Sequence, residues 1–370
     1  MPEQTAMTRV VVKVGSSVLT GAGGRLEPAR LQELARQLAA CAEGSRRPVL
    51  VSSGAVACGM ARLGLARRPM ALAQLQACAA IGQGELMHLY TEAFAAHGIT
   101  VAQVLLTQED FVDQERFRNA KQTLLTLLHK RVLPIVNEND TVAVDEIAFG
   151  DNDRLAALVA SAIDAQLLVL LSDVDGFLKD GRVVERVASL KELDGQPVAG
   201  SRRQTTRGGM ASKLEAAKIS GHSGIPMVIA NGTRSDVLTA VLAGQPVGTL
   251  FIPPRDRLTP RKWRIAFSLR QPRGSVVVDP GAARALQERR SSLLASGVRA
   301  VRGRFAAGAF ITVVNETGQE LGRGVTGFSS EELQRIHGTK SAEAARLLGR
   351  PRVPEVIHRD ALVLTEEWQT

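Results

Sequence analysis

Short runs of β-branched and aliphatic residues alternate with longer runs of helical periodicity along the first 250 residues. The runs with the length and composition of strands are 10–14, 49–51, 101–106, 133–136, 167–171 and 226–229. The runs that predict helices are 28–42, 71–97, 117–130, 154–163 and 210–220. Because strand-then-helix repetition produces right-handed crossovers, we expect an α/β domain with a mainly parallel open sheet sandwiched by helices.

The pattern changes after residue 250. Prolines and arginines crowd the segment 251–273. Beyond it, short β-rich runs at 275–278, 298–301 and 309–314 are separated by glycine turns and by two helical pieces, 282–290 and 330–336. We therefore expect a catalytic domain over 1–252, a linker over 253–273, a small mostly-β domain over 274–358 and a C-terminal tail over 359–370.

The positive charge of the chain is concentrated in its last third. Residues 251–370 contain 20 Lys and Arg against 12 Asp and Glu, a net charge of +8, whereas residues 1–250 contain 26 against 25. A basic module of this kind suits contact with nucleic acid. An arginine-rich genome composition would produce the same excess without any such partner.

Composition argues against several classes of protein. The sequence has no uninterrupted apolar run of about 18 residues, the length that a membrane helix needs, and its start lacks the pattern of a secretory leader. Cys41, Cys58 and Cys78 lie far apart without a C-x-x-C spacing, which argues against a disulfide framework or a thiolate metal site. We expect a cytoplasmic protein that supplies no metal site of its own.

The first candidate for chemistry is a lysine inside a predicted strand. Lys13 is costly to bury unless an anion meets it, and the small residues Gly15 and Ser16 follow directly. Their backbone amides are free to approach phosphate oxygens. The alternative is an edge-strand lysine that reaches solvent. A second strand ends in the Ser-Ser-Gly turn at 52–54, whose amides and hydroxyls suit a carboxylate or a phosphate but also occur in ordinary strand–turn–helix connections.

Two acidic loops are the most informative feature. The segments 137–140 (Asn-Glu-Asn-Asp) and 151–153 (Asp-Asn-Asp) each lie next to a predicted strand or helix end. Helix capping explains one such residue, but not this density. Because gathered carboxylates repel one another unless they bind ammonium groups or a metal, the loops favour a substrate that carries an amino group.

A phosphate site is predicted farther along the chain. A strand runs into Ser172 and Asp173, and the Gly-Gly turn at 208–209 opens a helix whose first turn carries Ser212 and Lys213. Free amides, a helix dipole and a lysine together suit phosphate. The sequence has no P-loop motif. A G-x-G-x-x-G pattern occurs at 322–327, but it follows a hairpin-like run and does not open the helix of a βαβ unit, so we do not interpret it as a dinucleotide-binding site.

Taken in order, these motifs resemble those of the glutamate 5-kinases, a branch of the amino acid kinase family. They are VVKVGSSVL at 11–19, VSSGA at 51–55, VNEND at 136–140, GDND at 150–153 and GGMASK at 208–213. The segment from about Gly274 resembles the PUA domain that many bacterial members carry. The resemblance therefore covers nearly the whole chain.

The resemblance implies transfer of the ATP γ-phosphoryl group to the side-chain carboxylate of L-glutamate, with Mg²⁺ accompanying ATP, as the first step of proline biosynthesis. Because the difficulty is repulsion between two anions, Lys13 and Lys213 would neutralise the transferring oxygens from opposite sides. Asp153 would hold the two ammonium groups in position. These three residues are the catalytic residues that we predict.

Matching positions also imply the binding residues. Those for glutamate are Ser53, Asp140 and Asn152, with Asp151 as a further contact to glutamate or metal. Those for ATP are Lys13, Gly15, Ser16, Ser172, Asp173, Arg207, Gly208, Gly209, Met210, Ala211, Ser212 and Lys213. Two features depart from the family's pattern and bear on the nucleotide contacts: position 207 is arginine where threonine is frequent, and the segment 176–207 is short.

Two alternatives stay open. A sibling kinase acting on N-acetylglutamate, aspartate or another acid would need the same lysines, although the acidic loops favour a free amino group. An RNA-binding protein built on the PUA-like module would use the basic segment, but only 4% of the residues are aromatic, which leaves few side chains for base stacking. The resemblance further implies inhibition by proline and a homodimer or homotetramer.

Overall fold

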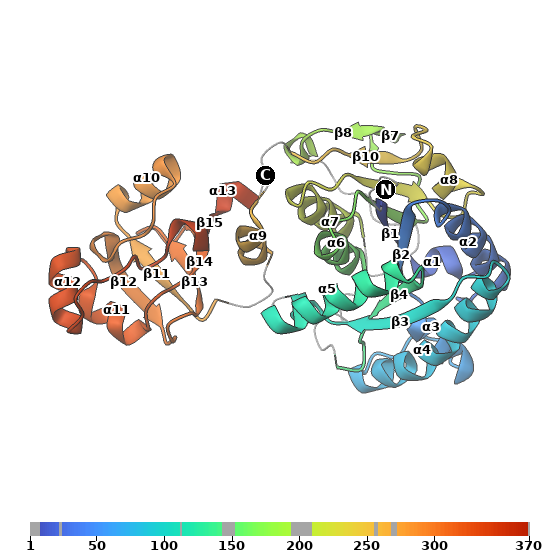
Figure 1. Cartoon of the computed structure of the whole chain (residues 1–370), viewed down its shortest axis with the longest axis horizontal. Coiled ribbons are helices and arrows are strands. Elements are labelled where there is room, and N and C mark those ends of the chain that lie inside the picture. Colours follow the sequence, from blue (N-terminus) through green and yellow to red (C-terminus); the bar gives the residue numbers. More distant parts are fainter. Residues whose placement is uncertain are drawn as a thin grey trace, which may run out of the picture. The chain divides into compact units, whose positions relative to one another are not determined.

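The computed structural model describes residues 8–21, 24–111, 113–142, 152–193, 209–254, 258–267 and 272–368. The chain divides into two compact units, Met1–Arg257 and Leu258–Thr370 (Figure 1). None of the helices in these described ranges is both long enough and apolar enough to cross a membrane.

The first unit is built on an eight-stranded sheet with the order β3-β4-β2-β1-β5-β9-β10-β8. Its strands are β1 (Thr8–Val14), β2 (Arg46–Ser52), β3 (Val101–Leu106), β4 (Leu133–Glu138), β5 (Leu167–Ser172), β8 (Arg186–Val187), β9 (Met227–Asn231) and β10 (Thr249–Phe251). All paired neighbours are parallel except β9 and β10. The mainly parallel sheet expected from the sequence is therefore confirmed.

Helices cover both faces of this sheet (Figure 1). They are α1 (Ser16–Leu19), α2 (Pro28–Cys41), α3 (Ala55–Arg62), α4 (Leu72–Ala95), α5 (Gln114–His129), α6 (Asn152–Ala162), α7 (Met210–His222) and α8 (Val237–Leu242). A two-stranded ribbon, β6 (Leu178–Lys179) with β7 (Arg182–Val183), and short 3₁₀ turns at Gln108–Phe111 and Leu190–Leu193 complete the described part of the unit.

Alternation along β1 decides which face receives the chemistry. Val10, Val12 and Val14 pack into the apolar core with α2 and α4. Lys13 has the opposite parity, so it points to the other face of the sheet, where α6 and α7 lie. One residue step in the strand therefore separates the core from the polar site.

The second unit contains a five-stranded sheet with the order β12-β11-β13-β14-β15. Its strands are β11 (Gly274–Val278), β12 (Val298–Gly303), β13 (Phe310–Val314), β14 (Glu320–Val325) and β15 (Leu362–Leu364). Its helices are α9 (Pro260–Ala266), α10 (Pro280–Arg289), α11 (Ser330–Ile336), α12 (Ser341–Leu348) and α13 (Thr365–Trp368), with 3₁₀ turns at Ala295–Gly297 and Arg359–Ala361. The expected small, mostly-β domain is thus present.

The ends of this second unit differ from the boundaries expected from the sequence. Ile265 and Ala266 of α9, placed in the expected linker 253–273, are buried in the core of the unit. Strand β15, placed in the expected tail 359–370, pairs with β14. Lys262 and Glu367 form an ion pair with an N–O distance of 2.9 Å, which ties α9 to α13. Apolar residues in both segments explain why they pack instead of remaining a linker and a tail.

The glycines of the G-x-G-x-x-G segment serve the packing of this sheet. Gly322 and Gly324 lie within β14. A Cβ atom at Gly322 would come within 2.5 Å of the Val363 carbonyl oxygen, and one at Gly324 within 2.7 Å of the Ala361 carbonyl oxygen. Glycine at these positions allows close approach of the neighbouring backbone.

Candidate active site

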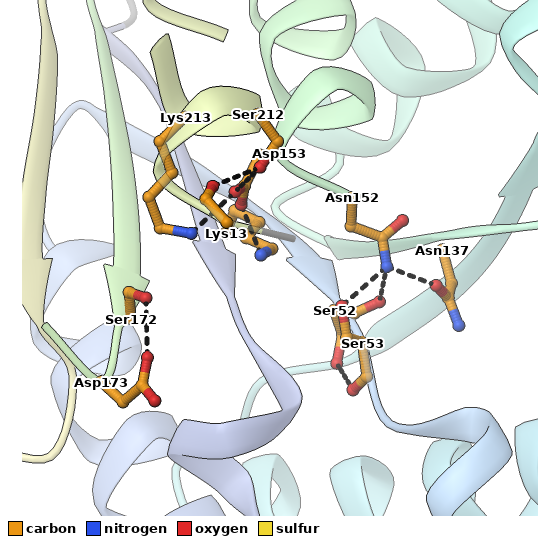
Figure 2. Close-up of polar contacts among 11 residues, drawn as sticks. Lys13, Ser52, Ser53, Asn137, Asn152, Asp153, Ser172, Asp173, Ser212 and Lys213 are labelled. Carbon is orange, nitrogen blue, oxygen red and sulfur yellow. Dashed lines mark hydrogen bonds and ion pairs between the residues drawn. The ribbon is translucent and has the colours of Figure 1, made fainter. Parts of the chain in front are cut away.

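Two lysines and an aspartate from three separate elements meet at one point of the first unit (Figure 2). Lys13 of β1 forms an ion pair with Asp153 Oδ1, and Lys213 Nζ of α7 lies 3.0 Å from Asp153 Oδ2. Asp153 is completely buried, and both lysine side chains are more than nine-tenths buried. The structure therefore brings together the three residues predicted to be catalytic.

The N-terminal turns of two adjacent helices set this geometry. Asp153 is the second residue of α6, and Ser212 and Lys213 lie in the first turn of α7. Ser212 Oγ donates to Asp153 Oδ2 at 3.1 Å, so one carboxylate oxygen accepts from both α7 residues. An ion pair between Arg154 and Glu215 further joins the two helices. The carboxylate is thereby held at both oxygens.

The triad keeps an excess of positive charge in a buried place. Burial alone would raise the pKa of Asp153, but the ammonium groups of Lys13 and Lys213 hold that pKa well below its ordinary value. Asp153 is therefore ionised, and the three side chains carry a net charge of +1. Because a buried charge without a counter-ion is costly, this point favours the approach of an anion.

A second polar cluster begins one residue earlier in the chain, at Asn152 (Figure 2). Asn152 Nδ2 lies within hydrogen-bond distance of three acceptors, the Ser52 carbonyl oxygen at 3.0 Å, Ser53 Oγ at 2.9 Å and Asn137 Oδ1 at 3.0 Å, and shares its two protons among them. Asn137 in turn donates from Nδ2 to Gln83 Oε1 at 2.8 Å. The amide of Asn152 is thus fixed with its nitrogen toward β2 and β4.

This orientation leaves the other atom of the Asn152 amide for a ligand. Within the described part of the chain, Asn152 Oδ1 is buried and has no hydrogen-bond partner. An unsatisfied buried acceptor costs about 1–3 kcal/mol, so native structures keep few of them without a reason. A hydrogen-bond donor such as an ammonium group would satisfy this oxygen.

Helix α3 contributes backbone donors next to the same cluster. Its N-cap is Gly54, with a φ of 121°, and no side chain caps the helix. The first amides of a helix have no intrahelical acceptor. Because Gly54 directly follows Ser53, these amides add an anion-binding element beside Asn152.

The candidate nucleotide residues lie at the ends of β1 and β5 and at the start of α7. Gly15 donates its backbone N–H to the Leu171 carbonyl oxygen at 3.1 Å, which brings the turn after β1 beside the end of β5. Ser172 Oγ donates to Asp173 Oδ1 at 3.2 Å (Figure 2). Gly209 is the N-cap of α7 and has no side chain to cap it. The first amides of α7, which have no intrahelical acceptor, therefore add donors that suit phosphate at this edge of the sheet.

The remaining predicted residues are placed as follows. Ser16 begins α1, Met210, Ala211 and Ser212 begin α7, and Asp140 lies just past the end of β4. Asp151, Arg207 and Gly208 lie outside the described residues. Because the carboxyl ends of neighbouring parallel strands meet at one edge of a sheet, the described residues share the position where α/β folds bind ligands.

Sequence reasoning missed the residues that support this site from behind. Gln83 and Tyr90 belong to α4, and Tyr90 Oη lies 2.7 Å from Ser52 Oγ. Their spacing of seven puts both on one face of a helix, which is the only signal that the sequence offers. It does not reveal that this face meets the ends of β2 and β4.

The fold and the buried cationic site at the strand ends suit a small-molecule kinase, to which the protein contributes mainly positioning and charge stabilisation of the phosphoryl group. Residues 8–231 match the model of the amino acid kinase family, and residues 274–348 match that of the PUA domain. The chain belongs to the amino acid kinase family.

Curated relatives are similar along nearly the whole chain. The chain is 48% identical to the glutamate 5-kinase of Thermus thermophilus over 366 residues, which cover 97% of this chain and 98% of the relative. It is 46% identical to the glutamate 5-kinase of Geobacter sp. strain M21 over 364 residues, 96% and 97% of the two chains. The resemblance to glutamate 5-kinases seen in the motifs is confirmed.

Proposed function

We propose that this protein transfers the γ-phosphoryl group of ATP to the side-chain carboxylate of L-glutamate, giving L-glutamyl 5-phosphate and ADP for proline biosynthesis. The observation that carries the proposal is the buried Lys13–Asp153–Lys213 triad, with the unsatisfied acceptor of Asn152 one residue away. The first feature suits the transferring phosphate, and the second suits the amino group of the acceptor. The names of the relatives support the same substrate.

The triad acts by charge. The acceptor carboxylate is already ionised at neutral pH, because the side chain of glutamate has a pKa of about 4.3, so no general base is needed. The barrier is repulsion between this carboxylate and the phosphate oxygens. Lys13 and Lys213 offset that repulsion, and Asp153 keeps their ammonium groups fixed before the reaction, so that little reorganisation is required.

The acceptor and the nucleotide are assigned to separate parts of the site. The α-ammonium group of glutamate would donate to Asn152 Oδ1 and pair with Asp140, while the α-carboxylate would accept from Ser53 and from the first amides of α3. The ATP phosphates would lie against Gly15, Ser16 and the start of α7. Ser172, Asp173 and the turn from Arg207 would contact the remainder of the nucleotide.

Mg²⁺ belongs to the proposal as a companion of ATP. The oxygens of Asp153 accept from two lysines and a serine, so this carboxylate fits an anchor for ammonium groups better than a metal ligand. A divalent cation would therefore be held by the phosphate oxygens. When bound, it supplies additional positive charge to the transferring group.

The test is an ADP-release assay on the full chain with a panel of acceptors. We expect activity with L-glutamate that exceeds the activity with N-acetyl-L-glutamate and L-aspartate by at least tenfold. A preference for the acetylated acid would overturn the assignment in favour of a sibling kinase, because acetylation removes the ammonium group that Asn152 is proposed to bind.

Regulation and assembly complete the proposal. We expect L-proline to inhibit the enzyme by overlapping the glutamate site. We also expect the protein to form a homodimer or a homotetramer and to have a cytoplasmic location. Inhibition that L-glutamate relieves would support the overlap, and an activity unaffected by L-proline would contradict it.

Light scattering of the purified chain would give its assembly state. A salt-dependent titration of the full chain with RNA would test the basic second unit as an RNA-binding module.

A further inference from the structure

Tyr90 is the only tyrosine of the chain, and it is completely buried in the C-terminal half of α4. Its ring packs in the apolar core of the first unit, where a phenylalanine would fill the same space. Its hydroxyl lies 2.7 Å from the hydroxyl of Ser52, which is also completely buried. The phenolic oxygen is therefore the feature of Tyr90 that core packing does not explain.

The direction of this hydrogen bond follows from counting protons. Ser52 Oγ donates its single proton to the carbonyl oxygen of Ser53 at 3.0 Å, and a carbonyl oxygen only accepts (Figure 2). Ser52 therefore accepts from Tyr90. The result is a directed relay from the Tyr90 hydroxyl, through the Ser52 hydroxyl, to the Ser53 carbonyl.

The relay ends on the peptide group that begins the candidate substrate site. Every described peptide bond of the chain is trans, so the carbonyl of Ser53 and the N–H of Gly54 point in opposite directions. Holding the carbonyl therefore sets the direction of the Gly54 amide. The Ser53 amide also donates to the Val14 carbonyl at 3.3 Å, and Ser53 Oγ accepts from Asn152. Contacts on its carbonyl, its amide and its side chain therefore hold Ser53, the residue directly before the Gly54 amide.

We propose that Tyr90 is a positioning residue for amino-acid binding: through Ser52 it holds the Ser53–Gly54 peptide in the orientation that receives the head group of the acceptor substrate. This inference rests on the proposed function. Tyr90 itself does not touch the substrate and contributes nothing to the Lys13–Asp153–Lys213 triad. Its loss should therefore change the binding of the amino acid and leave nucleotide binding and the chemical step nearly unchanged.

The experiment compares Tyr90→Phe, Ser52→Ala and the double variant. Tyr90→Phe should raise the KM for L-glutamate at least fivefold while kcat and the KM for ATP stay within twofold of the parent. Ser52→Ala should raise the same KM and also lower the Tm, because it leaves the buried Tyr90 hydroxyl without an acceptor. The double variant should recover most of the Tm, because both hydroxyls are then absent, but its KM should stay raised.

Phe94→Leu is the matched control. Phe94 lies on the same helix and is also completely buried, with its ring centroid 6.2 Å from that of Tyr90, but it has no polar group to contribute. It should lower the Tm while the KM for L-glutamate stays within twofold of the parent. A parallel rise of KM in this control would show that KM follows stability, and would overturn the positioning role.

The failures of the two proposals are distinguishable. If the parent chain phosphorylates L-glutamate and Tyr90→Phe keeps the parental KM, the positioning role is wrong and the proposed function stands. If the parent chain does not phosphorylate L-glutamate, the proposed function is wrong, and the positioning role fails with it.

Discussion

Asn152 and Asp153 are adjacent in the chain and direct their side chains into two different polar clusters. Asn152 donates to Ser53 at 2.9 Å, while Asp153 accepts from Lys213 at 3.0 Å (Figure 2). The first turn of α6 therefore joins the proposed acceptor site to the proposed phosphate site. A small rotation of this turn would move both sites together. The ion pairs from Asp153 and Arg154 to α7 restrain such a rotation.

Lys213→Ala tests the cationic side of this arrangement. The variant removes one of the two ammonium groups proposed to stabilise the transferring oxygens. We expect a loss of at least about 2 kcal/mol in transition-state stabilisation, which is roughly a thirtyfold fall in kcat/KM. The fall should appear mainly in kcat, measured by ADP release at saturating ATP and L-glutamate.

A surface lysine provides the control for Lys213→Ala. Lys121 lies in α5 and pairs with Asp164 at 3.0 Å, in a partly exposed position. Lys121→Ala should leave kcat/KM within twofold of the parent, because an exposed ion pair contributes only about 0–1 kcal/mol. Equal losses in the two variants would mean that Lys213 has no particular part in the reaction.

The fold and the strand-end loops were predictable because their signals are local. Alternation along the strand places Lys13 on the face opposite to that of Val12 and Val14. The polar run that begins at the end of β4 is evident in the sequence because the residues before it are apolar. Helix α3 was not predicted, because its eight residues form a short run with several small side chains. The part that α9 and β15 play in the second unit has no clear sequence signal, because their apolar residues lie among prolines and charges.

The support from α4 could not be predicted for a different reason. Gln83 and Tyr90 carry no local signal of function, and their partners Asn137 and Ser52 are 54 and 38 residues away. Tertiary packing alone decides that one face of α4 meets the ends of β2 and β4. The same applies to Asn152, whose free acceptor becomes evident only when its three nitrogen contacts are known.

Asp153→Asn tests whether the ionised carboxylate of Asp153 stabilises the fold, through the pH dependence of the free energy of unfolding. The folded-state pKa of Asp153 is lowered, so its ionisation stabilises the fold at pH values above the ordinary aspartate pKa of about 4. As the pH falls through that value toward the folded-state pKa, the unfolded chain takes up a proton first and this stabilisation is lost. Urea unfolding between about pH 3 and pH 7 should show a steeper acid-side decline for the parent than for the variant.

At neutral pH, Asp153→Asn should be less stable than the parent. Replacing the carboxylate leaves Lys13 and Lys213 buried without their counter-ion, and removing one partner of a buried ion pair costs about 3–5 kcal/mol. An unchanged free energy of unfolding at pH 7 would contradict the burial and pairing of this triad. The matched surface variant is Asp164→Asn, which should change the stability by less than about 1 kcal/mol.

Asn152→Ala tests the acceptor cluster separately. The variant removes the free Oδ1 and the three contacts of Nδ2, so the amino acid loses a partner and Ser53 loses a restraint. We expect the KM for L-glutamate to rise about tenfold or more, in line with a hydrogen bond to a charged group of about 1.5–3 kcal/mol. The KM for ATP should change less than threefold. A rise in the KM for ATP alone would place Asn152 in the nucleotide site instead.

The contact between α3 and α4 gives a last test, in which two glycines of one helix should respond in opposite directions. A Cβ at Gly82 would lie 1.8 Å from the Ala55 carbonyl oxygen and 2.4 Å from the Gly59 nitrogen, so Gly82→Ala must push α3 away. Overpacking of this kind costs about 1–3 kcal/mol. Because Ala55 opens α3 directly after Gly54, the displacement should also raise the KM for L-glutamate.

Gly84 is the matched position two residues along α4. It is exposed, and a Cβ there would meet nothing within 4 Å. Gly84→Ala should therefore stabilise the chain by about 0.5–1 kcal/mol, because alanine is the better helix former and restricts the unfolded chain. Thermal unfolding and the KM for L-glutamate, measured on both variants, check the pair. If Gly82→Ala matched Gly84→Ala in Tm and KM, the close backbone contact at Gly82 would not hold α3 in place.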